Sequence, residues 1–560
     1  MTATDTHTEG HVDADVVVPR EGGDGLYRLI ASNDHKMVGR LWIGASLLFF
    51  LAFSILGVIN DIERADLGGF SVFGSATRFF QAWVLFRTGI IFMVVLPLFI
   101  GIATSIVPLQ IGSPSIAFPR LASAAYWSWI FASIAHLISF AADGGLGGTG
   151  EIARVRTDAT QLTMTSLGVM IIALLAASLC LATTIVALRP AGMSLLRVPI
   201  FTWSILVATS VWLLSLPVLI ANLIFSWVDL QGRPPIEFGS LDQIYARVEW
   251  AWSQPQIYAY AIPVLGILGE IMPVKAKHRQ AGREVLMSLI GLFGLLSFGA
   301  WAQSFVSRGS HPSFQADTIP EDQRGNFIYE EFLYVAFGLA IAVPVFLAIG
   351  GVFDTIRRGS APKPDGAVLG AVSGALLLLG AVIVGEVRVI PFWDALHIND
   401  EFLSSITAQV GLVVAASLAS ALGALVYWAP KLFGGYAGNA PAMGGALALL
   451  GGGTLLGLTN LIAAFDGLRD VAIENTTGTL ANTMTFLAII GSILLVLGAI
   501  SMLGTVVPAL TSDELLPDDP WDGHTLEWSA PSPPPLGNFI EPIGPIRSAE
   551  PLLDEFEEVG

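Results

Sequence analysis

Eight histidines and one cysteine are the side chains of this 560-residue sequence best suited to bind a transition metal. Imidazole is a good ligand for both iron and copper. The histidines are His7, His11, His35, His136, His278, His311, His397 and His524. Only His136 falls within a long apolar segment, and the other seven fall in expected tails and loops. The lone cysteine, Cys180, excludes a disulfide framework and a thiolate metal cluster.

Long apolar segments must position these side chains. Hydrophobic residues make up 54% of the sequence and charged residues 13%, whereas a soluble domain carries about 25% charged residues. The segments reach the roughly 18 residues of a membrane span. We expect about twelve spans, beginning near residues 41, 84, 121, 161, 198, 258, 285, 329, 366, 405, 442 and 483. The net charge of −18 argues against a nucleic-acid partner, because a polyanion repels phosphate backbones.

The distribution of lysine and arginine predicts the orientation in the membrane. With an even number of spans and both termini in the cytoplasm, the inner segments hold more of these residues than the outer loops. The sequence therefore predicts a cytoplasmic segment at 1–40, a twelve-helix membrane domain at 41–510 and an acidic, proline-rich cytoplasmic tail at 511–560. The composition of the tail favours an extended surface chain over a domain.

Several stretches resemble the catalytic subunit (subunit I) of bacterial aa3-type haem-copper cytochrome c oxidases. They are VPLQIGSPSIAFPRLASAAYW at 107–127, WAWSQPQIYAYAIPVLGILGEIMPV at 250–274, SNDHKMVGRLW near residue 32, and DPWDGHTLEW in the tail. The resemblance covers nearly the whole chain. It implies an all-α polytopic membrane protein with a twelve-helix subunit I-like bundle. In the family this bundle encloses two haems and one copper, held by six histidines.

The six ligand positions of the family carry other residues in this chain. Counting back from Pro97 places Phe86 at the span-two histidine and Arg87 beside it. Counting back from Trp428 places Ala408 and Val410 at the two histidines of span ten.

The copper positions differ as well. One copper histidine falls on Gln254, whereas the tyrosine that the family links to it is retained as Tyr258. The acid two residues beyond this histidine becomes Gln256, and the paired histidines of span seven become Gln303 and Ser304.

The proton-path and metal-site positions of the family are altered too. Ser115 stands at the entrance acid of one path and Glu284 at the lysine of the other. Only Arg469 of a paired-arginine motif is kept, next to Asp470. We therefore expect no catalytic, cofactor-binding or metal-ligating residue, and no haem or copper.

The remaining polar residues allow two interpretations each. Arg87, inside a span, is either an ion or lipid site or a structural ion pair in the haem cavity. His136 is either a metal ligand or a hydrogen-bonded core residue, and Tyr258 is expected in the core. His397, Asp400 and Glu401 form either a divalent-cation site or a solvated acidic loop.

Three tryptophans and one glutamate also allow two interpretations each. We expect Trp250, Trp252 and Trp301 to pack in the core or at the membrane interface rather than to line a cofactor pocket. Glu284 adjoins a basic loop, which favours an interfacial salt bridge over proton uptake.

The predicted function is a non-catalytic structural or partner subunit of a respiratory-type complex in the plasma membrane. Its expected partners are the lipid bilayer and subunit II- and III-like membrane proteins. Two alternatives stay open. One is a genuine terminal oxidase that reduces O₂ with electrons from cytochrome c and pumps protons. The other is a transporter or lipid-binding protein that reuses the cofactor cavities.

Overall fold

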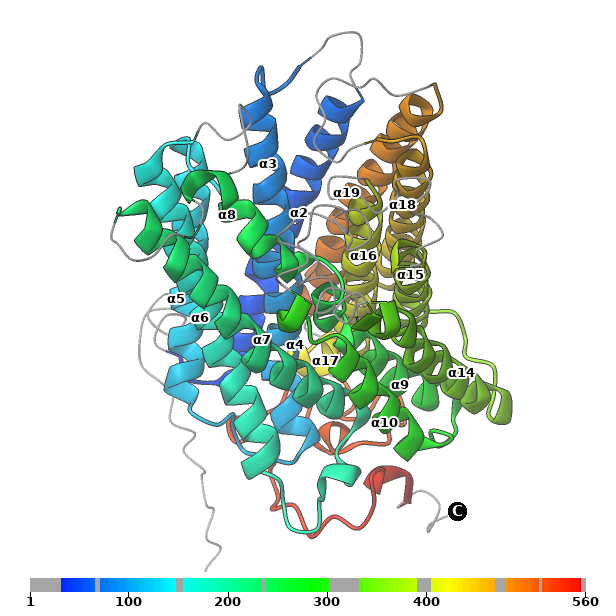
Figure 1. Ribbon diagram of the computed structural model, residues 1–560. Helices are drawn as coiled ribbons and strands as arrows, with labels where there is room; N and C mark the ends of the chain where they lie inside the picture. Colours follow the sequence, from blue (N-terminus) through cyan, green and yellow to red (C-terminus); the bar gives the residue numbers. More distant parts are fainter. Residues whose placement is uncertain are drawn as a thin grey trace, which may run out of the picture.

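The fold is a bundle of long α-helices, as a computed structural model of the chain shows (Figure 1). The structure describes residues 32–65, 71–147, 155–232, 238, 240–302, 332–333, 335–389, 404–468, 479–512 and 516–554. These residues contain no β-strand. The longer helices are α2 (His35–Arg64), α3 (Ala76–Gly89), α4 (Leu96–Gln110), α5 (Pro119–Ala141), α6 (Thr157–Ala187), α7 (Ile200–Leu230), α9 (Ile262–Ala276), α10 (Arg283–Leu296), α14 (Ala342–Arg358), α15 (Gly366–Val389), α16 (Ser404–Tyr427), α18 (Asn439–Phe465) and α19 (Thr479–Thr511). Two short helices are α8 (Ser240–Val248) and α17 (Ala429–Leu432).

Eleven helices within the described residues are long and apolar enough to span a membrane. They match eleven of the twelve expected spans. The exception is the span expected near residue 285, where α10 has only 14 residues. At 1.5 Å per residue α10 is about 21 Å long, which is less than the roughly 30 Å of a hydrocarbon core. The number twelve therefore stays a prediction.

Local sequence explains where several helices begin. The Asp34 carboxylate accepts a hydrogen bond from the Lys36 backbone N–H and caps α2. The Ser75 hydroxyl accepts one from the Arg78 N–H and caps α3. Both caps satisfy backbone donors that have no partner in the first turn of a helix. His35, expected in the N-terminal segment, is the first residue of α2.

The second span contains a π-helical turn. Residues 76–110 run continuously from α3 through the π-helix at Ile90–Val95 into α4, and the apolar part of this span is entirely buried. π-turns occur frequently at functional sites. This turn begins three residues after Arg87 and four after Phe86, which falls on the family's haem-ligand position.

The tail is packed against the membrane domain, at the lower end of the bundle in Figure 1. Glu527 and Trp528 are buried, and the Glu527 carboxylate accepts hydrogen bonds from Gln110 Nε2 at 3.0 Å and Trp428 Nε1 at 3.2 Å. Lys431 donates to the backbone carbonyls of Asp518 and Ala530. The segment has little regular structure, as its composition indicates, but these specific contacts make it part of the protein core.

Candidate functional site

A cavity of about 60 Å³ lies among α2, α3, α16 and α19. Phe86, Arg87 and Val410 line it together. The span-two ligand position and one of the two span-ten ligand positions therefore face a common space. Ala408, two residues before Val410, is buried but is not among the residues that line this cavity.

Polar side chains gather at one part of this cavity. Asn60, Asp61 and Arg64 come from successive turns near the end of α2, and Arg64 Nη1 contacts Asp61 Oδ1 at 3.4 Å. Arg64 also donates to Asn460 Oδ1 at 2.9 Å, and the Ser492 hydroxyl donates to the Asp61 carboxylate. Charged groups inside a span are costly unless they are paired, which explains this clustering.

Arg87 is fully enclosed, with 1% of its surface exposed. Its guanidinium donates to the Thr407 hydroxyl and lies 4.9 Å from the centre of the Trp83 ring. Both contacts stabilise a buried cation. Phe86 and Arg87 thus occupy part of the space beside α16. The 60 Å³ cavity is the part of this space that no side chain fills.

A second cluster links the position of a copper histidine to α16. Gln409 Nε2 donates to Gln254 Oε1 at 2.8 Å and to Tyr258 Oη at 2.6 Å. Arg388 Nη1 donates to Gln409 Oε1 at 2.5 Å, and Tyr258 Oη donates to the Ala381 carbonyl at 3.2 Å. We call Gln254, Tyr258, Arg388 and Gln409 the amide cluster.

Close packing of a neighbouring helix confines the amide cluster. Gly385 on α15 lies so near that a Cβ atom there would overlap Tyr258 Oη and lie within 3 Å of Gln409 Nε2 and Gln254 Oε1. A side chain at this position would therefore have to displace the ends of these three side chains. The side-chain amides of Gln254 and Gln409 and the hydroxyl of Tyr258 thus fill the space between Gln254 and α16.

Gln256, at the position of the family's proton-feeding acid, is held by two hydrogen bonds. Its Nε2 donates to Ser215 Oγ at 2.9 Å, and its Oε1 accepts from the Gly299 N–H at 2.9 Å. An amide satisfied in this way holds a fixed orientation and carries no titratable proton.

The structure places most of the other weighed residues in the core. His136 Nε2 lies 3.2 Å from Thr88 Oγ1 and its Nδ1 lies 3.1 Å from Ser166 Oγ, which supports the interpretation as a hydrogen-bonded core residue. Trp250 and Trp252 are buried as expected, whereas Glu284 is exposed in the first turn of α10.

Several predicted positions lie outside the described residues. They are Gln303, Ser304, His397, Asp400, Glu401, Arg469 and Asp470. Among the described residues, no group of three or more histidine, cysteine, aspartate or glutamate side chains is arranged to hold a metal ion.

Sequence reasoning missed Gln409 and the polar group on α2. Gln409 lies between Ala408 and Val410, the two ligand positions of span ten. It is the only residue of the segment 404–427 whose side chain is an amide or charged. Asn60, Asp61 and Arg64 lie near the end of span one and were not singled out from the sequence. Their spacing of one helical turn was the available signal.

The residues described at these positions do not reproduce the family's ligand set. A haem iron in the oxidases takes axial imidazoles, and copper takes further imidazoles. Phe86, Val410, Ala408 and Gln254 offer none, although the buried Gln254 Nε2 has no hydrogen-bond partner among the described residues.

Comparisons with known proteins identify the kinship. Residues 37–318, slightly more than half of the chain, match the family described as cytochrome c and quinol oxidase polypeptide I. Cytochrome c oxidase subunit 1 of Bacillus subtilis is 27% identical over 561 residues, which cover 96% of this chain and 84% of that protein. Cytochrome c oxidase subunit 1 of Corynebacterium glutamicum is 26% identical and covers 99% of this chain and 93% of its own.

A solved structure shows the same fold. A haem-copper terminal oxidase dimer superposes with a TM-score of 0.61 and 10% identity, covering 93% of this chain and 89% of that chain. At this identity the similarity concerns the fold alone.

These comparisons correct one prediction. The expectation that the chain has no haem or copper is wrong, because the matched relatives are cytochrome c oxidases and the neighbour is a haem-copper oxidase. The altered side chains led to that expectation, but no finding demonstrates loss of the cofactors. Fold, family match and full-length similarity agree, and the chain belongs to the cytochrome c and quinol oxidase polypeptide I family.

Proposed function

We propose that this subunit I-like protein is a non-catalytic structural partner in a respiratory-type complex of the plasma membrane. Both termini lie in the cytoplasm, and subunit II- and III-like proteins are its partners. The proposal concerns turnover of O₂ and assembly with other subunits. It makes no statement about cofactor content.

The amide cluster is the observation that carries the proposal. By the resemblance, Gln254 stands at the position of a copper histidine and Tyr258 at the tyrosine linked to it. Here Gln409 bridges Gln254 and Tyr258 with bonds of 2.8 and 2.6 Å, and Gly385 packs directly against them. The amide of Gln256, also fully bonded, replaces an acid that would pass protons. A site closed in this way favours a structural role.

The surface of the bundle supports a partner role. Large apolar side chains are exposed along the spans, including Phe131 at 65%, Leu214 at 67% and Leu295 at 71%. In a membrane such side chains face either lipid or neighbouring subunits. The positive-inside rule supports the orientation, because Lys275, Lys277, Arg279 and Arg283 cluster between two spans.

The direct test is O₂ consumption by the protein purified from its native membrane with its bound subunits. Reduced cytochrome c and a quinol serve as electron donors, and Bacillus subtilis cytochrome c oxidase serves as the positive control. We expect no turnover above the level of the detergent buffer. Co-purification of subunit II- and III-like proteins is expected in the same preparation.

A genuine terminal oxidase is the second candidate, and full-length similarity to cytochrome c oxidases favours it. Turnover that disappears in Gln254→Ala but persists in Ser417→Ala would establish this candidate and refute ours. Ser417 lies on the same helix as Gln409 but bonds only to the Val413 carbonyl of its own helix. A chain that purifies alone, without activity, would instead favour transport or lipid binding.

A further inference from the structure

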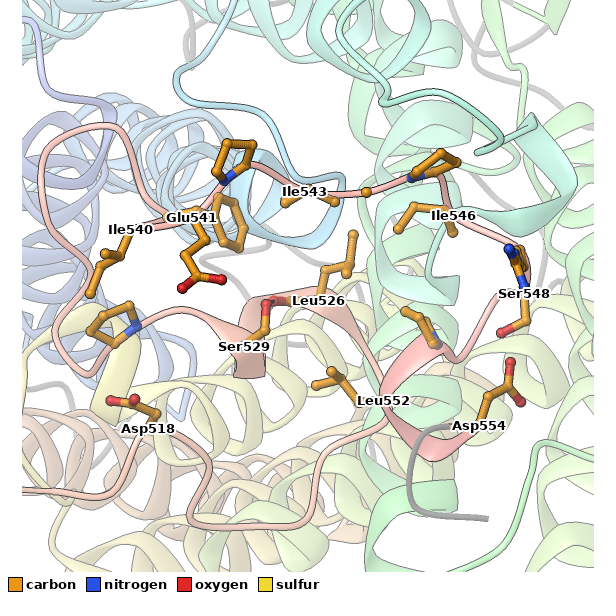
Figure 2. Close-up of a pocket in the computed structure, with 17 residues that line it drawn as sticks. Asp518, Leu526, Ser529, Ile540, Glu541, Ile543, Ile546, Ser548, Leu552 and Asp554 are labelled. Carbon is orange, nitrogen blue, oxygen red and sulfur yellow. Dashed lines mark hydrogen bonds between the residues drawn. The ribbon is translucent and has the colours of Figure 1, made fainter. Parts of the chain in front are cut away.

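The tail forms a groove of about 960 Å³ on the end of the bundle where it packs (Figure 2). All of its lining residues come from positions 518–554, so the tail encloses this space by itself. Figure 2 shows Leu526, Ile543, Ile546 and Leu552 around the opening, with the carboxylates of Asp518, Glu541 and Asp554 at its edges. The groove therefore has a mixed polar and apolar lining, with carboxylates at its rim.

The rim carries negative charge that is available to a ligand. Within the described part of the chain, Glu541 forms no ion pair. Asp554 contacts Arg279, and the Lys431 ammonium, which donates to the Asp518 backbone carbonyl, also attracts the Asp518 carboxylate. Arg547 is the only basic residue in the lining. Ile540, beside Glu541, exposes 78% of its surface to solvent. Carboxylates beside exposed apolar side chains suit a ligand that is both cationic and apolar.

The negative charge of this chain excludes two possible ligands of the groove, namely its own N-terminal segment and anionic lipid. Residues 511–560 contain twelve aspartates and glutamates against a single arginine. The N-terminal residues 1–31 contain six acids and two arginines, so this segment is repelled by the rim. Anionic lipid headgroups at the cytoplasmic surface are repelled for the same reason.

We propose that the groove binds a lysine- and arginine-rich cytoplasmic segment of another membrane polypeptide. This inference rests on the proposed function, since it presumes a partner subunit and a cytoplasmic tail. Segments that flank spans on the cytoplasmic side are enriched in lysine and arginine. A partner in the complex therefore presents the complementary charge on the face where the groove lies, and its apolar side chains bury Ile540. Charge complementarity of this kind selects the partner and speeds association.

A peptide assay tests the groove on the full-length chain in a neutral detergent. The probe is a fluorescent decapeptide that alternates lysine with leucine, and the control peptide alternates glutamate with leucine. We expect only the lysine peptide to bind, with an affinity that falls as salt is raised from 50 to 500 mM. Asp518→Lys and Glu541→Lys are each expected to weaken binding about fivefold, because each replaces an attraction by a repulsion of up to about 1 kcal/mol.

Matched variants make the result decisive. Asp522→Lys changes the net charge of the same tail equally, but Asp522 lies outside the groove and is expected to leave binding unchanged. Ile540→Ser is expected to weaken binding without affecting folding, since the side chain is exposed. Equal loss in Asp522→Lys, or equal binding of the glutamate peptide, would overturn the proposal.

Carbodiimide cross-linking of the native complex tests the partner. This reagent joins carboxylates to lysine amines in direct contact. We expect links from Asp518 or Glu541 to lysines of a second polypeptide, whereas links confined to this chain's own lysines would overturn the partner assignment. If the chain purifies alone, the proposed function fails, and the peptide assay still reports on the groove.

Discussion

Replacement of Gln409 by leucine tests whether the amide cluster holds the centre of the bundle together. The substitution keeps the volume of the side chain nearly constant but removes three hydrogen bonds, to Arg388, Gln254 and Tyr258. Hydrogen bonds inside membrane proteins contribute about 0.6 kcal/mol on average, and buried bonds in proteins up to about 1.5 kcal/mol. Three bonds therefore predict a loss of about 2 to 4 kcal/mol in the free energy of unfolding.

Denaturation of the detergent-solubilised protein, followed by tryptophan fluorescence, measures this loss. Ser417→Ala is the matched control, because it is equally buried on the same helix and removes one bond within that helix. We expect the control to cost less than about 1 kcal/mol. If Gln409→Leu costs no more than Ser417→Ala, the amide cluster does not stabilise the bundle and the reasoning fails.

Three further predictions concern packing and the tail. Gly385→Ala is expected to destabilise the protein because its Cβ overlaps Tyr258, whereas Gly411→Ala, which meets open space, is expected to have little effect; thermal unfolding that ranks them otherwise contradicts the packing. Burial raises the pKa of Glu527, so its contribution to stability is complete below the pKa of the unfolded chain and is lost as pH rises towards the folded pKa. The hydrogen-exchange protection factors of residues 516–554, which are corrected for the intrinsic rise of amide exchange with pH, should therefore fall as pH rises above the usual pKa of a glutamate. This fall lies below the range where Lys431, whose pKa burial lowers to about 8, loses its proton. Glu527→Gln keeps both accepted hydrogen bonds and should abolish this change, so identical profiles for both proteins would refute the linkage. Lys431→Met should expose the tail to proteolysis, since it removes donors to the carbonyls of Asp518 and Ala530; equal sensitivity in Lys277→Met, a change at an exposed lysine, would show that the effect is unspecific.

The helices could be predicted from the sequence because apolar length alone determines them. An apolar segment as long as 404–427 forms a buried helix. The structure places Phe86 and Val410, two of the positions obtained by counting, on the same cavity. The π-helical turn at Ile90–Val95 could not be predicted, since its residues also favour an ordinary helix.

The candidate site was predictable only in part. Motif spacing located Gln254 and Tyr258, but the bridging role of Gln409 depends on how α9 and α16 face each other. The burial of the tail was missed for a different reason. A composition rich in proline and acidic residues is typical of a solvent-exposed chain. The tail is buried because individual side chains have specific partners in the rest of the protein, such as Gln110 and Trp428 for Glu527.

The docked tail has a consequence for how the protein is made. A ribosome translates residues 516–554 only after every span has been synthesised. Until then His35, Lys36 and Gln110 lack Asn538 and Glu527, the side chains that later bond to them. The membrane domain therefore inserts in an unfinished state, and residues 516–554 later close the end of the bundle against which they pack. A chain interrupted before residue 516 would carry all its helices and still present unsatisfied polar groups, the kind of defect by which membrane quality-control proteases recognise incomplete subunits.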